Sequence, residues 1–212
     1  EGCRALGVMR GDITNVSYLD ASLASEDGYN TLLKYYRAWS ALASKLPRGI
    51  NLQSDFTWYD AFDRESSCAQ RDPHFERMSV LYNIAVCRAS LATSVSHGDT
   101  IDDVKRSVRL FQSAAGFFDQ IIQSPLRGSV TLDMHQEALV IAKTAMLANA
   151  QAAFYDIASR TRKSHSILGR LAAGVRDLCQ EISRRCLAEG FAGSQLCDQI
   201  GRPAGALALY YD

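Results

Sequence analysis

The sequence has 212 residues, of which 47% are hydrophobic and 22% are charged, with only four prolines, a composition that excludes disorder and fits a globular chain with a sizeable core. Twenty-three basic and twenty-three acidic side chains cancel, so the whole surface has no net charge to attract nucleic acid or anionic lipid. No continuous apolar run has the length of a membrane span, and no secretory leader is recognised. We therefore expect a soluble, cytoplasmic protein, and the first residue, Glu1, suggests a piece of something longer.

The first part of the chain combines a weakly patterned segment, a helix and a short extended stretch. Residues 1–24 contain three glycines without clear periodicity, which indicates a loose or partly helical initial segment. Apolar side chains then recur at helical spacing, so a helix is predicted over 25–46, before Pro47. Residues 50–58 alternate between apolar and polar side chains, apart from Ser54, which predicts one short β element.

Four more helices are predicted after the extended stretch. Pro73 opens a helix that ends near Ser94, and the next helix follows Thr100 and reaches Ile122. A long helix is expected over 133–162, with small side chains that allow close packing. The last runs over 164–187.

The predicted fold class is all-α, a helical bundle with a helical-repeat-like core and at most one short β element near 50–58. We place Gly190 and Gly193 at the end of the last helix and leave residues 190–212 unassigned, except that Tyr210 and Tyr211 are expected to start another buried helix. The aromatic residues Tyr36, Trp58 and Phe75 are assigned to core packing, because aromatic side chains at such spacings are usually buried.

Six cysteines are scattered along the chain without a C-x-x-C pair. Cys179 and Cys186 lie two helical turns apart on one face, a separation too large for a disulfide. We expect reduced and mostly buried thiols.

Catalytic and cofactor-binding motifs are not recognised in the sequence. It has no phosphate-binding glycine loop, no H-E-x-x-H and no G-x-S-x-G, and its four histidines are isolated. The acidic group Asp60, Asp63 and Glu65 could bind a cation, but we interpret it as a solvated loop because a calcium site needs more oxygen ligands. We expect no enzyme activity, no cofactor and no metal site.

Three apolar side chains lie off the main helical seams and are the candidate partner-binding residues. Phe154, Ile167 and Leu171, called here the apolar strip, could form an extra apolar edge on two consecutive helices. Four basic side chains near them are called the basic rim: Arg160, Arg162, Lys163 and Arg170. An amphipathic helix with an acidic polar face would complement this combination. The alternative is that a wide helix face buries the strip against a neighbour.

Five segments occur in the order and spacing of the BRO-one domain, the domain of the Alix, His-domain tyrosine phosphatase and rhophilin type. They are Leu32–Tyr36, Phe56–Phe62, Phe75–Ala85, Phe111–Phe118 and Met146–Gln151, with Asn149 in place of the family's usual glutamine. The chain therefore resembles a single partial BRO-one domain over residues 1–212, in which 25–189 form the helical core.

The resemblance implies a boomerang-shaped domain and non-catalytic adaptor work in endosomal sorting, with recruitment to endosomes. In Alix-type members the domain receives the carboxy-terminal amphipathic helix of an ESCRT-III subunit of the charged multivesicular body protein class. The ungapped stretch from Leu147 to Leu171 carries that binding site onto Phe154, Ile167 and Leu171. The alternative function is a rhophilin-type signalling scaffold in Rho GTPase pathways. Neither function implies nucleic-acid binding, and contact with membranes would be indirect, through partners.

Overall fold

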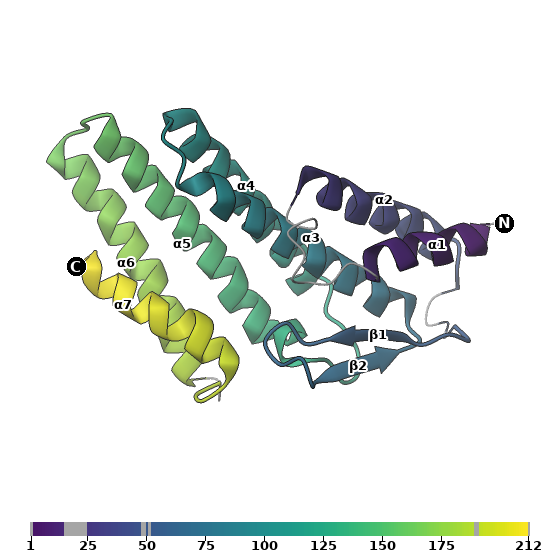
Figure 1. Ribbon diagram of the computed structural model, residues 1–212. Helices are drawn as coiled ribbons and strands as arrows, with labels where there is room; N and C mark the ends of the chain where they lie inside the picture. Colours follow the sequence, from purple (N-terminus) through teal and green to yellow (C-terminus); the bar gives the residue numbers. More distant parts are fainter. Residues whose placement is uncertain (1, 15–24, 48–49, 51, 189–190, 212) are drawn as a thin grey trace.

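The computed structural model describes residues 2–14, 25–47, 50, 52–188 and 191–211 (Figure 1). Its elements, in chain order, are α1 (Gly2–Thr14), α2 (Glu26–Ala43), β1 (Phe56–Tyr59), β2 (Ser67–Gln70), α3 (Pro73–Ser96), α4 (Ile101–Ile122), the 3-10 turn η1 (Leu132–Met134), α5 (Gln136–Arg160), α6 (His165–Ala188), the π-turn η2 (Cys197–Gly201) and α7 (Arg202–Tyr210). The predicted all-α class is confirmed.

The helices from α3 to α6 lie side by side in chain order, each antiparallel to the one before (Figure 1). Helices α1 and α2 cover one end of this array and α7 covers α6 at the other end. Polar side chains start several of the helices: Ser25 accepts a hydrogen bond from the Gly28 amide, and Thr100 accepts one from the Asp103 amide. These caps satisfy amides that have no partner inside the helix.

The β element is a hairpin, whereas the sequence predicted at most one strand. Strand β1 pairs antiparallel with β2, with Phe56 opposite Gln70 and Tyr59 opposite Ser67. The predicted stretch over 50–58 is also too early, because the ladder begins only at Phe56. Strand β2 escaped prediction because it has no β-branched or aromatic residue and buries none of its side chains.

Both ends of the chain are more regular than the sequence indicated. Helix α1 forms within the initial segment, and Ile13 from it is buried in the core. Beyond Gly193, the chain forms η2 and α7. The expectation for Tyr210 was wrong: it ends α7 and is 78% exposed, because α7 buries Ala204 and Ala208 instead. Residues 15–24 and Gly190 lie outside the described residues.

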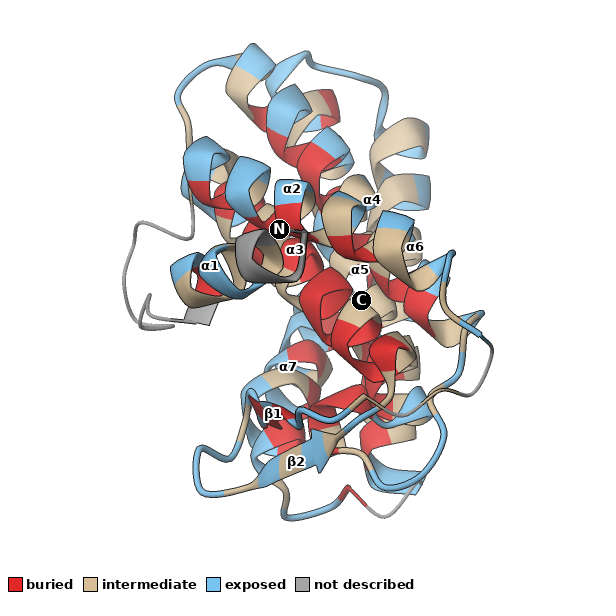
Figure 2. Cartoon of the chain, turned by 90° about the vertical axis from the view of Figure 1, so that its right-hand side faces the viewer, coloured by how far each residue is buried: buried red, intermediate tan, exposed pale blue. Residues whose placement is uncertain are grey.

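Two apolar clusters form the core, and the buried residues occupy the facing sides of the helices (Figure 2). The larger cluster joins α2, α3 and α4 to the hairpin, and Trp58 and Phe75 belong to it, as predicted; Tyr36 is only partly buried. The smaller cluster joins α5, α6 and α7, and Cys179 and Cys186 belong to it. These two cysteines, Cys87 and Cys197 are buried reduced thiols, and Cys68 is half-buried.

Glu76 of α3 lies at the centre of the hairpin end and is fully buried although its side chain is charged. One of its oxygens accepts hydrogen bonds from Arg10 Nε at 3.0 Å and from the Tyr35 hydroxyl at 2.6 Å. The other accepts one from Trp58 Nε1 at 2.7 Å. Burial, followed by the charge of Glu76, raises the pKa of Tyr35, which therefore stays a hydrogen-bond donor. The carboxylate thus ties α1, α2, β1 and α3 together.

Helix α3 is long and apolar enough to cross a membrane by length and composition alone. The sequence did not suggest this, because polar side chains interrupt the apolar residues of the helix. In the structure it packs against α2 and α4, and 56% of its most apolar window is buried. The core helix of a globular domain passes the same test, so the composition of α3 agrees with its place in the core.

Candidate functional site

The candidate site lies where α5 ends and α6 begins, at one tip of the helical array (Figure 1). The turn is closed by backbone hydrogen bonds from the Lys163 amide to Ala158 O and from the Thr161 amide to Ile157 O, each 2.9 Å. Arg162 adopts φ 53°, the left-handed conformation that glycine usually supplies at a helix end. The turn therefore holds an arginine in a backbone conformation that a non-glycine residue adopts only at a cost.

Contacts between α5 and α6 fix the register of the two helices, and therefore the positions of the apolar strip residues along them. Gln151 Nε2 donates to Leu171 O at 3.4 Å, and a side chain at Gly174 would meet the same amide nitrogen at 2.8 Å. Ile167 lies seven residues before Gly174, on the same face of α6, and Phe154 lies one turn beyond Gln151 on α5. The register thus brings the three strip residues to neighbouring levels along the α5–α6 seam.

The strip is only partly covered. Phe154 is 41% exposed, while Ile167 and Leu171 are half-buried. The alternative in which a neighbouring helix buries the whole strip does not hold for Phe154. Exposed apolar side chains that gather at one place are typical of interaction surfaces.

The basic rim divides into one fixed and three free side chains. The Arg160 guanidinium donates to Gly98 O at 3.1 Å and to Asp99 O at 3.2 Å, and its Nε lies 2.9 Å from an Asp156 carboxylate oxygen. Arg160 therefore joins the end of α5 to the turn between α3 and α4, and most of its bonding capacity is used inside the protein.

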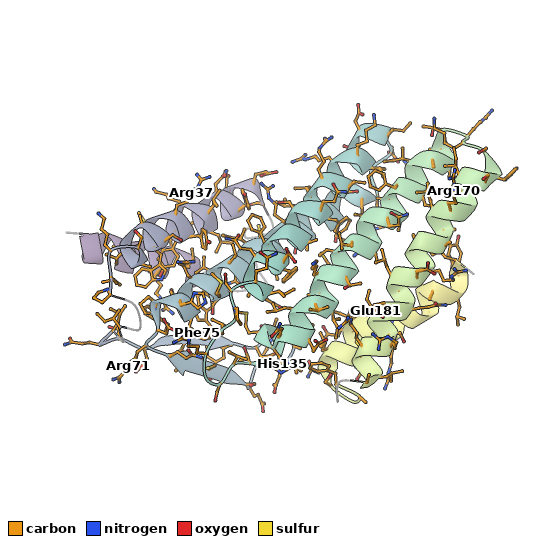
Figure 3. The ribbon with its side chains drawn as sticks, turned by 180° about the vertical axis from the view of Figure 1, so that it is seen from behind. Arg37, Arg71, Phe75, His135, Arg170 and Glu181 are labelled. Carbon is orange, nitrogen blue, oxygen red and sulfur yellow. The ribbon has the colours of Figure 1, made fainter. Side chains whose placement is uncertain are left out.

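Arg162, Lys163 and Arg170 are exposed, and within the described part of the chain none of them forms an ion pair. Arg170 extends outward near the tip of α6, at the opposite end of the helix from Glu181 (Figure 3). Glu181 itself is held by Arg184 and Arg185, and the hydrogen bond from Arg184 is the main reason that the pKa of its carboxyl falls to about 2. Unlike Arg184 and Arg185 near the other end of α6, these three basic side chains at the tip have no acidic partner in the described chain.

The acidic group considered for a cation does not converge. Asp60 is buried and accepts the amides of Phe62 and Asp63, whereas Asp63 and Glu65 are exposed. Among the residues that the structure describes, no three His, Cys, Asp or Glu side chains come together in a way that could hold a metal ion. The sequence missed the buried partner of Asp60, which is Asp133, and no periodic or motif signal marks it.

A family model described as a BRO1-like domain matches residues 1–198. The chain is 31% identical over 176 residues to the ALG-2 interacting protein X of Dictyostelium discoideum and 30% identical over 162 residues to the pH-response regulator protein palA/RIM20 of Saccharomyces cerevisiae. The matches cover 81% and 75% of this chain but only 21% and 24% of those relatives. The chain therefore spans about a quarter of these relatives or less.

Solved structures agree with the sequence matches. The ALIX BRO1 CHMP4C complex superposes with a TM-score of 0.80 at 25% identity, over 99% of this chain and 61% of that one. A structure described as the basis for endosomal targeting by the Bro1 domain superposes with a TM-score of 0.72 at 20% identity, over 89% of this chain and 51% of that one, and shares the fold.

Proposed function

Since this chain belongs to the BRO1-like domain family, we propose that it is a non-catalytic interaction module of endosomal sorting that binds the carboxy-terminal amphipathic helix of an ESCRT-III subunit. The observation that carries the proposal is the tip of α5 and α6, where the apolar strip is partly exposed beside three basic side chains without ion pairs in the described chain. Family membership supports the adaptor class.

An amphipathic helix fits this tip because its two faces match the two kinds of side chain. Its apolar face would place leucine or other large side chains against Phe154, Ile167 and Leu171, which supply the contact with the largest hydrophobic gain. Its acidic face would meet Arg162, Lys163 and Arg170, which favour encounter and fix the orientation more than they add affinity. Arg160 holds the turn in shape and takes a smaller part in binding.

The nature of the partner is supported by the solved relative in which an ALIX BRO1 domain is in complex with CHMP4C. CHMP4C belongs to the charged multivesicular body protein class, the class that we propose for this chain. A vacuolar protein-sorting protein BRO1 from Gibberella zeae, 28% identical over 174 residues, supports the link to sorting. We infer that the chain is cytoplasmic and reaches endosomes through such a partner.

Calorimetric titration of the chain with carboxy-terminal ESCRT-III peptides tests the proposal. The matched pair of variants is Leu171→Asp and Leu187→Asp, two leucines on α6, of which Leu187 is 66% exposed at the far end of the helix. We expect saturable binding to the wild type and to Leu187→Asp, and a loss of at least about 2 kcal/mol for Leu171→Asp. Equal binding by both variants would show that the peptide does not bind at the tip, and no binding by the wild type would refute the proposed function.

A further inference from the structure

Two buried aspartates fasten the hairpin to the beginning of α5. Asp60, directly after β1, accepts the Asp133 amide at 3.2 Å, and Asp133, in η1, accepts the Ala61 amide at 3.0 Å. Each carboxylate thus accepts a backbone amide from the other segment, although Asp60 and Asp133 are 73 positions apart in the sequence, and this reciprocal pair of hydrogen bonds is called here the Asp60–Asp133 clamp. Asp60 also accepts the Phe62 amide at 2.7 Å, so the clamp fixes the start of the loop between β1 and β2.

The clamp places two carboxylates together without a positive side chain. Asp60 is 3% exposed and Asp133 is 4% exposed. Within the described chain, no lysine, arginine or histidine hydrogen-bonds to either carboxylate; the other partner of Asp133 is the Thr131 hydroxyl at 2.5 Å.

The charged groups of the adjoining elements are engaged elsewhere or exposed. His135, at the start of α5, packs edge-on against Phe191, and Glu137 pairs with Arg185 of α6 at 2.7 Å. In the hairpin loop, Asp63, Arg64 and Glu65 are exposed. The group of like charge that faces Asp133 is therefore Asp60.

We propose that the Asp60–Asp133 clamp is a proton-binding site, which takes up one proton on mild acidification and thereby strengthens the attachment of the hairpin loop to α5. The proton comes from solvent and binds a carboxylate oxygen of Asp133. One negative charge of the buried pair is removed, while an oxygen of Asp133 remains to accept the Ala61 amide.

The loop that the clamp fixes contains Phe62, so protonation of the clamp affects how firmly an apolar side chain is held in position. Phe62 is partly buried and packs against the smaller core cluster. It also lines one end of an open groove of about 510 Å³ between α3 and α5, with Tyr82, Met146 and Ile200. A firmer clamp holds Phe62 in place at this end of the groove.

The direction of the pH effect follows from the environment of Asp133. Burial is the main cause that raises the pKa of its carboxyl from 3.8 to about 6; the Thr131 hydroxyl lowers it, the charge of Asp60 raises it, and the amides of Ala61 and Met134 lower it by smaller amounts. A carboxyl with a higher pKa in the folded than in the unfolded chain stabilises the fold as the pH falls through the folded pKa. The equilibrium constant for folding should therefore rise about tenfold between pH 7 and pH 5 on account of this group.

The test compares urea unfolding of the wild-type chain, Asp133→Asn and Asp63→Asn at pH 7 and pH 5. The amide side chain that Asp133→Asn introduces has no proton to gain, so the about tenfold rise attributable to Asp133 should be absent from that variant. The Asp63→Asn variant, altered in the same loop outside the clamp, should keep the wild-type rise. An equal pH dependence of wild type and Asp133→Asn would overturn the proposal.

A second measurement on the wild type decides the matter if Asp133→Asn does not fold. Amide hydrogen exchange at Ala61 and Phe62, corrected for the intrinsic effect of pH, should be slower at pH 5 than at pH 7. Exchange at Ala61 and Phe62 that is equal at the two pH values, or faster at pH 5, contradicts the proposed proton site.

Discussion

At the hairpin end a charged side chain is buried and both of its oxygens are hydrogen-bonded, whereas at the α5–α6 tip the apolar strip is only partly buried and three basic side chains lack ion pairs in the described chain. Glu76 joins four elements and is inaccessible to solvent. Phe154, near the end of α5, is 41% exposed, and Lys163 and Arg170 are exposed in the following turn and at the start of α6. Buried polar groups need partners inside the fold, so the first arrangement serves stability; our proposal is that the second serves binding, because surface groups without partners in the fold can take them from outside.

The largest effect is expected from Glu76→Ala. This change removes the acceptor for Arg10, Tyr35 and Trp58 in a buried site, so urea unfolding should show a loss of about 3–5 kcal/mol. Glu26→Ala is the surface control, because Glu26 is 48% exposed and its pairs with Arg88 and Arg106 are worth at most about 1 kcal/mol. Similar losses for both variants would contradict the contrast between the two regions.

A similar loss is expected when the aromatic part of the hairpin end is removed. Trp58 is 9% exposed, and Trp58→Ala should lower the free energy of unfolding by about 3–5 kcal/mol. The neighbouring Tyr59 points to solvent and is 62% exposed, so Tyr59→Ala should change it by about 0.5 kcal/mol or less. Thermal or urea unfolding of the two variants checks that buried and exposed side chains alternate along β1. A near-neutral effect of Trp58→Ala would place Trp58 outside the core.

At the tip, Arg162→Gly should separate stability from binding. Arg162 has φ 53°, so glycine should stabilise the turn by about 1 kcal/mol while removing one charge of the basic rim. Lys163→Ala removes the adjacent charge without this backbone gain. Urea unfolding and peptide titration of both variants should show weaker binding in each but higher stability only in Arg162→Gly; unchanged or lower stability in that variant would show that the turn holds Arg162 without strain.

The smallest effect is expected from Arg170→Ala. Because Arg170 is an exposed rim charge, its loss should weaken peptide binding by less than about 1 kcal/mol and flatten the dependence of affinity on salt. Arg160→Ala should behave differently and lower stability, since Arg160 bonds to Gly98 and Asp99. Titrations at low and high salt check Arg170→Ala, and urea unfolding checks Arg160→Ala. An unchanged salt dependence for Arg170→Ala would show that Arg170 does not take part in binding.

The helical part of the fold was predictable because the apolar side chains keep one period over long segments. The seam of α6 shows this: Val175, Cys179, Ile182 and Cys186 follow helical spacing and are all buried. Strand β2 and helix α7 were missed for the opposite reason. Strand β2 is four residues long with no buried side chain, and α7 buries small alanines, so neither has an apolar period that sequence analysis detects.

For the candidate site, the sequence shows that the strip residues lie off the helical seams, and their role in binding stays a proposal; the internal contacts of the charged side chains could not be predicted. Phe154, Ile167 and Leu171 stood out because each lies one position away from a seam. The internal role of Arg160 depends on the backbone of the turn between α3 and α4, about 60 residues away in sequence. Contacts of this kind, like the reciprocal hydrogen bonds of the Asp60–Asp133 clamp, depend on tertiary geometry and leave no local pattern in the sequence.

The most direct test of the central claim compares Ile167→Asp with Val175→Asp on the same helix. Val175 is fully buried, whereas Ile167 is only half-buried in the apolar strip. Urea unfolding and titration with an ESCRT-III carboxy-terminal helix should show that Ile167→Asp folds nearly as well as the wild type but loses at least about 2 kcal/mol of binding, while Val175→Asp is strongly destabilised. A folded Ile167→Asp that binds at full strength, or one that unfolds like Val175→Asp, would contradict the account.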